Sequence, residues 1–131
     1  MKDSERRLLT ELRRALLPLH KTLLEWERKT YEREHGRKMG GGELLQVIMT
    51  APQFAWLHPI SELIVRIDQT VEPESVATEA DSSALVDQVE GLLTASEHGT
   101  GFQRRYYDAL QRQPAVVLAH ADVRRTLKSM R

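Results

Sequence analysis

The side chains with the clearest potential for chemistry are the five histidines, His20, His35, His58, His98 and His120. No two of them stand four residues apart on one predicted helix, which is the spacing of a common helical zinc site. Glu32 and His35 form a single Glu-x-x-His motif. A di-iron bundle needs two such motifs and two further carboxylates. The sequence therefore predicts neither a metal site nor a cofactor.

Three histidines belong to apolar surroundings instead. His20 lies beside the leucines of the first predicted helix, and His120 takes an aliphatic position in the last one. His58 stands two residues after Trp56, at the end of an apolar run. Such histidines are usually hydrogen-bonded and partly buried, and they could hold a ligand only if two of them converged. Helical geometry points the rings of Tyr106 and Tyr107 about 100° apart, which predicts one in the core and the other exposed. The candidate ligand or interface residues are Trp56, His58, His20, His120, Tyr106 and Tyr107.

Nucleophilic catalysis has one candidate, Ser61, because the sequence holds no cysteine. Ser61 stands three residues after His58, a spacing at which two helical side chains can touch. It lacks the nucleophile elbow and the orienting acid of a serine hydrolase. The turn at residues 98–101 is rich in glycine but has no P-loop lysine. These residues support no named reaction, and the sequence favours a protein that is not an enzyme.

Charge is balanced in total but divided along the chain. Residues 1–42 carry 11 basic and 7 acidic side chains. Residues 43–99 carry 1 basic and 10 acidic side chains, and residues 100–131 carry 7 basic and 2 acidic ones. The first interpretation is that the acidic middle packs beside the two basic ends, although each exposed ion pair stabilises by only about 0–1 kcal/mol. The second is a basic patch that weakly binds a phosphate backbone. Its residues would be Arg104, Arg105, Arg124, Arg125 and Lys128. No nucleic-acid-binding motif accompanies them, so a nucleic-acid partner is not favoured.

The elements that must position these side chains are helices. Six apolar residues alternate in steps of three and four through the first 35 positions, which is typical of a packed amphipathic helix. They are Leu9, Leu12, Leu16, Leu19, Leu23 and Trp26. Leu17, Leu24 and Tyr31 widen this stripe beyond the needs of one neighbour. A surface this wide predicts contact with more than one helix, or with a second copy of the chain.

Prolines and glycines divide the remainder into further helices. Gly36 suits a helix C-terminus, and Pro59 suits the first turn of a helix that begins near His58. This helix is apolar on most sides, which predicts that it is the central one. Thr78 and Asp81 resemble a capping box. Without any alternating strand pattern, the sequence predicts an all-α fold of one domain over residues 1–131, an irregular antiparallel bundle of five or six helices.

Composition limits the function further. The absence of cysteine excludes a disulfide scaffold and fits a reducing compartment. We see no secretory signal, and the longest apolar run, at residues 115–119, is far too short to cross a membrane, so we expect a cytoplasmic protein. The leading hypothesis is a non-catalytic bundle that acts through protein–protein contact, as a homodimer or with another protein. The alternatives are a small-ligand or metal-binding bundle that uses buried histidines and aromatic residues, and weak nucleic-acid binding.

Overall fold

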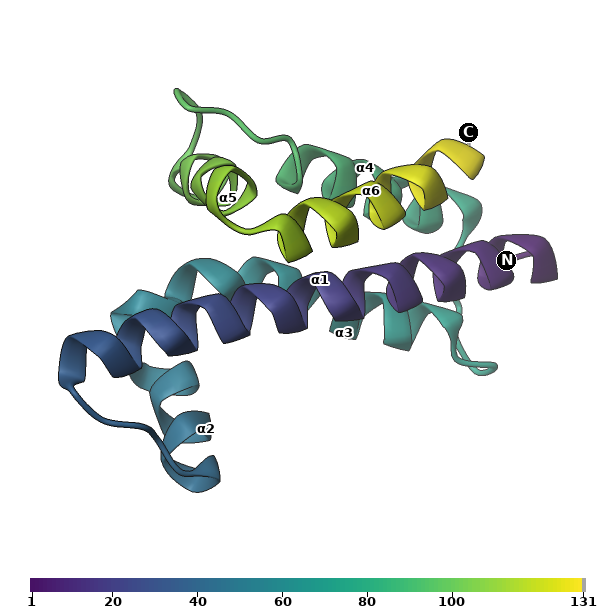
Figure 1. The fold of residues 1–131 in the computed structure, drawn as a ribbon. Helices are drawn as coiled ribbons and strands as arrows, with labels where there is room; N and C mark the ends of the chain where they lie inside the picture. Colours follow the sequence, from purple (N-terminus) through teal and green to yellow (C-terminus); the bar gives the residue numbers. More distant parts are fainter. Residues whose placement is uncertain (131) are drawn as a thin grey trace.

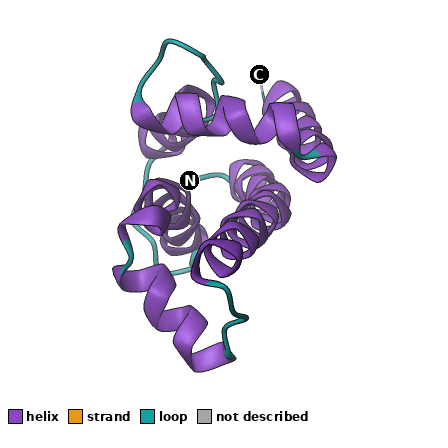
Figure 2. Cartoon of the chain, turned by 60° about the vertical axis from the view of Figure 1, so that its left-hand side comes forward, coloured by secondary structure: helices purple, strands orange, loops and turns teal. Residues whose placement is uncertain are grey.

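The computed structural model describes residues 1–130 and folds them into helices joined by loops, with no strand among them (Figures 1 and 2). The elements are α1 (Asp3–His35), α2 (Gly41–Thr50), the short 3-10 helix η1 (Pro52–Leu57), α3 (His58–Val71), α4 (Glu79–Leu92), α5 (Gly101–Arg112) and α6 (Pro114–Ser129). The prediction of an all-α fold with five or six helices is confirmed. Among the described residues, no helix combines the length and the apolar character needed to cross a membrane.

Helix α1 forms because its leucines repeat at helical spacing, and it continues through Pro18, which faces solvent. Its fully buried side chains are Leu9, Leu12, Leu16, Leu19 and Leu23. It ends at Gly36, whose φ of 69° lies in the left-handed region that favours glycine. The backbone N–H of Arg37 donates to the carbonyl of Glu32 at 3.1 Å, which closes the last turn.

Helix α1, rather than α3, is the centre of the bundle, which corrects the prediction made from the apolar character of residues 58–71. It packs against α3, α4, α6 and η1, whereas α3 packs against α1, α4 and η1. The reason is length, because α1 has 33 residues and the next longest helix, α6, has 16. Figure 1 shows α6 running beside α1 in the opposite direction, so that the two ends of the chain lie at the same end of the bundle.

Polar contacts fix the register between α1 and α3. Arg13 of α1 pairs with Asp68 of α3. Seven residues later on α1, His20 contacts Ser61, which lies seven residues before Asp68 on α3. A further heptad along α1, Glu27 accepts a hydrogen bond from Gln53 in η1. The numbers rise on one helix while they fall on the other, so α1 and α3 are antiparallel.

Helix ends follow local sequence signals. Thr78 and Asp81 form the predicted capping box at the start of α4, and Thr100 and Gln103 form a second one at the start of α5. Pro59 lies in the first turn of α3, as predicted. These side chains satisfy or remove backbone N–H groups that a helix start leaves without partners.

Candidate functional site

Helix α2 is the one α-helix of the described chain that contributes no buried residue. It projects from one end of the bundle (Figure 1), and its main packing partner is η1. Leu45 and Met49 stand four residues apart, on one face, with 62% and 67% of their surfaces exposed. Leu44, Val47 and Ile48 are half-buried. The chain therefore exposes the apolar side of α2. We call this surface, defined by Leu45 and Met49, the α2 face.

Glu27 is the least expected residue of the interior, because it is a carboxylate with only 5% of its surface exposed. One carboxylate oxygen accepts the indole N–H of Trp56 at 3.0 Å, and the other accepts the side-chain amide of Gln53 at 2.8 Å. The guanidinium of Arg105 lies 3.8 Å from the first oxygen. These contacts join α1, η1 and α5 at one buried polar cluster, which we call the Glu27 cluster.

Sequence reasoning missed Glu27 because a lone glutamate on a helix normally faces solvent. A signal was present, since Glu27 lies four residues after Leu23, at the edge of the leucine stripe. It also continues the seven-residue column of Arg13 and His20. The candidate Trp56 lies beside Glu27, and its indole N–H donates to the carboxylate.

Ser61 pairs with a different histidine from the one expected. Its hydroxyl lies 2.7 Å from Nε2 of His20, whereas His58 is exposed and its Nε2 lies 3.3 Å from the carbonyl oxygen of Ile48. The spacing that would allow His58 and Ser61 to touch therefore does not produce that contact, because the antiparallel packing of α1 on α3 brings His20 to Ser61. Burial lowers the pKa of His20, which keeps its ring neutral.

Tyr106 and His120 form a second interior pair. The Tyr106 side chain is fully buried, and its hydroxyl lies 2.6 Å from Nδ1 of His120. Burial lowers the pKa of His120, with a smaller contribution from the positive charge of Arg124. Burial also raises the pKa of the Tyr106 phenol. Both groups are therefore neutral at about pH 7, and we assign the phenol as the donor and Nδ1 as the acceptor because a phenol O–H is more acidic than a neutral imidazole N–H. This hydrogen bond joins α5 to α6. Tyr107 is half-buried, so only its neighbour enters the core.

The candidate histidines do not share one contact in the described chain. His20 meets Ser61, His58 meets a carbonyl of α2, and His120 meets Tyr106. His35 stacks on Tyr31 with ring centroids 3.9 Å apart. Among residues 1–130 no group of three or more His, Asp or Glu side chains is arranged to hold a metal ion. The structure thus gives the histidines separate structural partners.

The predicted basic residues lie on two helices, with Arg104 and Arg105 on α5 and Arg124, Arg125 and Lys128 on α6. Arg105 faces the carboxylate of Glu27, and Arg125 pairs with Asp122 one turn earlier. Arg104, Arg105 and Tyr107 line one open hollow of about 400 Å³. Two of the five charges are therefore already met by carboxylates of the same chain.

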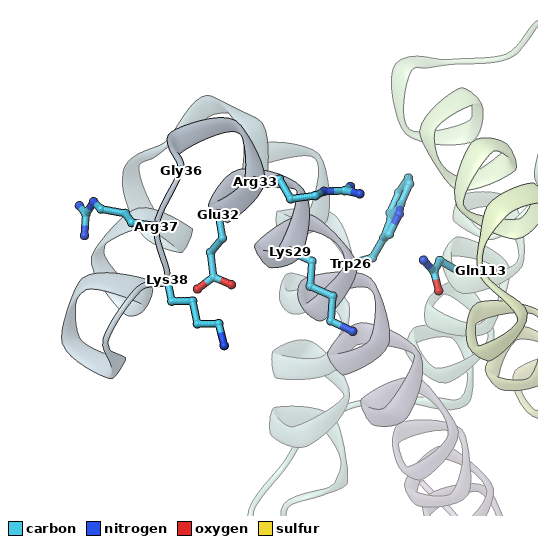
Figure 3. Close-up of a pocket in the computed structure, with 8 residues that line it drawn as sticks. All are labelled: Trp26, Lys29, Glu32, Arg33, Gly36, Arg37, Lys38 and Gln113. Atoms are coloured by element: carbon cyan, nitrogen blue, oxygen red, sulfur yellow. The ribbon is translucent and has the colours of Figure 1, made fainter.

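A pocket of about 540 Å³ opens where α1 ends and α6 begins (Figure 3). It is lined by Trp26, Lys29, Glu32, Arg33, Gly36, Arg37, Lys38 and Gln113. We call it the Trp26 pocket. In Figure 3 Lys38 and Glu32 lie at one end, Trp26 and Gln113 lie at the other, Lys29 extends between the two ends, and Arg33 reaches toward the indole ring. Its volume is that of a small-molecule site.

The charges around the Trp26 pocket are unequally paired. Arg37 points away from the other lining side chains in Figure 3 and forms an ion pair with Glu43 of α2. Glu32 accepts the backbone N–H of Met39 at 2.6 Å and lies 3.5 Å from Nε of Arg28. Sequence reasoning missed this pocket because its walls come from α1, the connector at residues 36–40 and the start of α6, which only the fold brings together.

Comparison with protein-family models, with curated proteins and with solved structures returned no match. Function must therefore be inferred from the residues themselves. Among the exposed features of the described surface, two are suited to contact with another molecule. These are the apolar α2 face and the Trp26 pocket.

Proposed function

We propose that this protein acts through protein–protein contact, that α2 is its docking helix, and that the partner is a second copy of the chain. The observation that carries the proposal is that α2 is an apolar helix with no buried residue. A short amphipathic helix that lays its apolar face against another protein is a recurrent mode of recognition. Exposed apolar side chains that gather on one face commonly mark such contacts.

The distribution of charge supports self-association. Residues 44–57 contain no Asp, Glu, Lys or Arg, whereas such residues make up 29% of the whole chain. A two-fold dimer places the same patch of each copy against the other. A charged patch would then repel its own copy, but an uncharged apolar patch does not. The α2 face is therefore suited to pair with itself.

The wide stripe of α1, which suggested dimerisation from the sequence, offers a weaker contact surface. Leu24 and Trp26 are half-buried and pack against the core, and only Leu17 remains exposed, at 38%. Most of that stripe is thus used within one chain. The hypothesis of a homodimer is kept, but the proposed contact moves from α1 to α2.

The size of α2 sets the strength of the contact. Full burial of a Leu or Met side chain stabilises by roughly 1.5–3 kcal/mol, so the exposed parts of Leu45 and Met49 are each worth about 1–2 kcal/mol. Two copies bring four such side chains, or about 4–8 kcal/mol before the cost of association. Because the cost of association must be subtracted from this figure, it is an upper limit, and we expect a weak dimer with a dissociation constant of roughly millimolar.

Sedimentation velocity over a wide range of concentrations tests the proposal. The wild type should show a concentration-dependent rise toward the mass of a dimer, and the double variant Leu45→Ser, Met49→Ser should stay monomeric. Val76→Ser is the matched control, because Val76 is 95% exposed but lies in the loop before α4. A wild type that stays monomeric at about 1 mM would contradict self-association. Equal loss of association in the control variant would contradict the assignment to α2.

A further inference from the structure

We propose that the Trp26 pocket binds a small organic anion that carries a planar ring and a phosphate group. This proposal is independent of docking through α2. The pocket has a volume of about 540 Å³, with Lys38 at one end, the aromatic ring of Trp26 at the other and Lys29 between them. Pockets of roughly 300–1,000 Å³ with mainly apolar walls and a few convergent polar groups are typical ligand sites.

The cations at the pocket are not required by the fold. Lys29, Arg33 and Lys38 are exposed, and none of them forms an ion pair with a carboxylate in the described structure. Arg33 donates instead to the hydroxyl of Thr30 at 3.3 Å. Their positive charges are therefore available to an anion that enters the pocket. Arg37 is a less available cation because it is held by Glu43.

The helix dipole does not account for this arrangement. Basic side chains in the last turn of a helix complement its negative end, and this explains Arg33. The effect fades within one turn. Lys29 lies more than one turn before the end of α1, and Lys38 lies beyond the helix, yet both line the same pocket.

Glu32 is the one carboxylate of the pocket lining, and its role is to anchor the connector. Its side chain accepts the backbone N–H of Met39, whose side chain is buried, and Arg28 offsets its charge. Because Lys38 precedes Met39 directly, this anchor holds Lys38 beside the pocket. Glu32 thus helps to place the ammonium group of Lys38 at the pocket.

Trp26 and Gln113 supply the opposite end. The indole of Trp26 meets that of Trp56 edge to face, with ring centroids 6.5 Å apart, so its position is set by packing. It also lines a second hollow of about 380 Å³ next to the first, together with Lys29 and Gln113. A planar ring can stack on the indole, while the Gln113 amide offers both a donor and an acceptor to the edge of the ring. A phosphate on the same molecule reaches Lys29 and Lys38.

Isothermal titration with three probes tests the proposal, namely adenosine monophosphate, adenosine and inorganic phosphate. The intact nucleotide should bind at roughly millimolar concentration or tighter, and each half alone about tenfold or more weakly. The double variant Lys29→Ala, Lys38→Ala should weaken nucleotide binding about tenfold, with little change in any adenosine binding. Added salt should weaken binding of the nucleotide by the wild type.

Lys128→Ala is the matched control, since Lys128 is an exposed lysine at the far end of α6. Trp26→Leu should weaken binding of both adenosine and the nucleotide, and circular dichroism checks that this variant folds. The lysine variants keep the test valid if it does not, because both lysines are exposed. Three results would overturn the proposal: nucleotide binding no tighter than phosphate binding, no nucleotide binding at several times ~1 mM, or an equal loss of nucleotide affinity in Lys128→Ala.

Discussion

Glu27 gives the sharpest test of how this bundle is held together. Replacing it with alanine removes the acceptor of the Trp56 indole N–H and the Gln53 amide, which lie 3.0 and 2.8 Å from its two oxygens. A buried donor that loses its partner costs about 1–3 kcal/mol. Glu27→Ala should therefore lower the free energy of unfolding by about 3–5 kcal/mol, a range also typical of breaking a buried charged contact.

Urea denaturation followed by circular dichroism measures this loss, and Glu34→Ala is the matched control. Glu34 lies one heptad later on the same helix and is exposed, so its removal should change the free energy of unfolding by less than about 0.5 kcal/mol. Trp56→Phe should cost about 1.5–3 kcal/mol, and the double variant should cost less than the two single losses together. If Glu27→Ala costs no more than Glu34→Ala, the Glu27 cluster does not organise the core.

Three further predictions concern the ends and the interior of the helices. Burial lowers the pKa of His20 and His120, so on acidification the unfolded chain binds protons at these histidines before the folded chain does. Stability should therefore be highest above about pH 6.5 and decrease as the pH falls through the lowered pKa values of the folded state. His120→Asn should flatten the pH dependence of the urea midpoint between about pH 8 and pH 5. Tyr106→Phe should lower the free energy of unfolding by about 1 kcal/mol and raise the pKa of His120, measured by NMR titration, unless the bond to Nδ1 is absent. Gly36→Ala should lower the thermal midpoint, because a φ of 69° costs a residue with a Cβ about 1–2 kcal/mol, and an unchanged midpoint would show that Gly36 is not held in this conformation.

The fold was predictable where one local rule decides the structure. The spacing of Leu9 to Leu23 alone places the buried face of α1, and Thr78 with Asp81 alone defines the start of α4. Pro59 likewise marks the first turn of α3. In each case the residues that matter are neighbours in sequence, so the sequence contains the whole interaction.

The candidate site was less predictable because its contacts join distant segments. Glu27 meets Trp56 across 29 positions and His20 meets Ser61 across 41, and neither pairing follows until the register of α1 on α3 is known. The exposure of α2 likewise depends on which segments pack around it. Hydrophobic spacing indicates which face is apolar, but it does not say whether another element covers that face.

Cross-linking through a single introduced cysteine tests the central claim, self-docking through α2, most directly. The chain has no cysteine of its own, so Met49→Cys and the control Val76→Cys each create one thiol at an exposed position. A two-fold contact between α2 helices brings the same face of both copies together, and a disulfide forms where the two cysteine Cα atoms come within roughly 7 Å. We predict that mild oxidation of Met49→Cys yields disulfide-linked dimer much faster than oxidation of Val76→Cys. Equal rates for the two variants would contradict docking through α2.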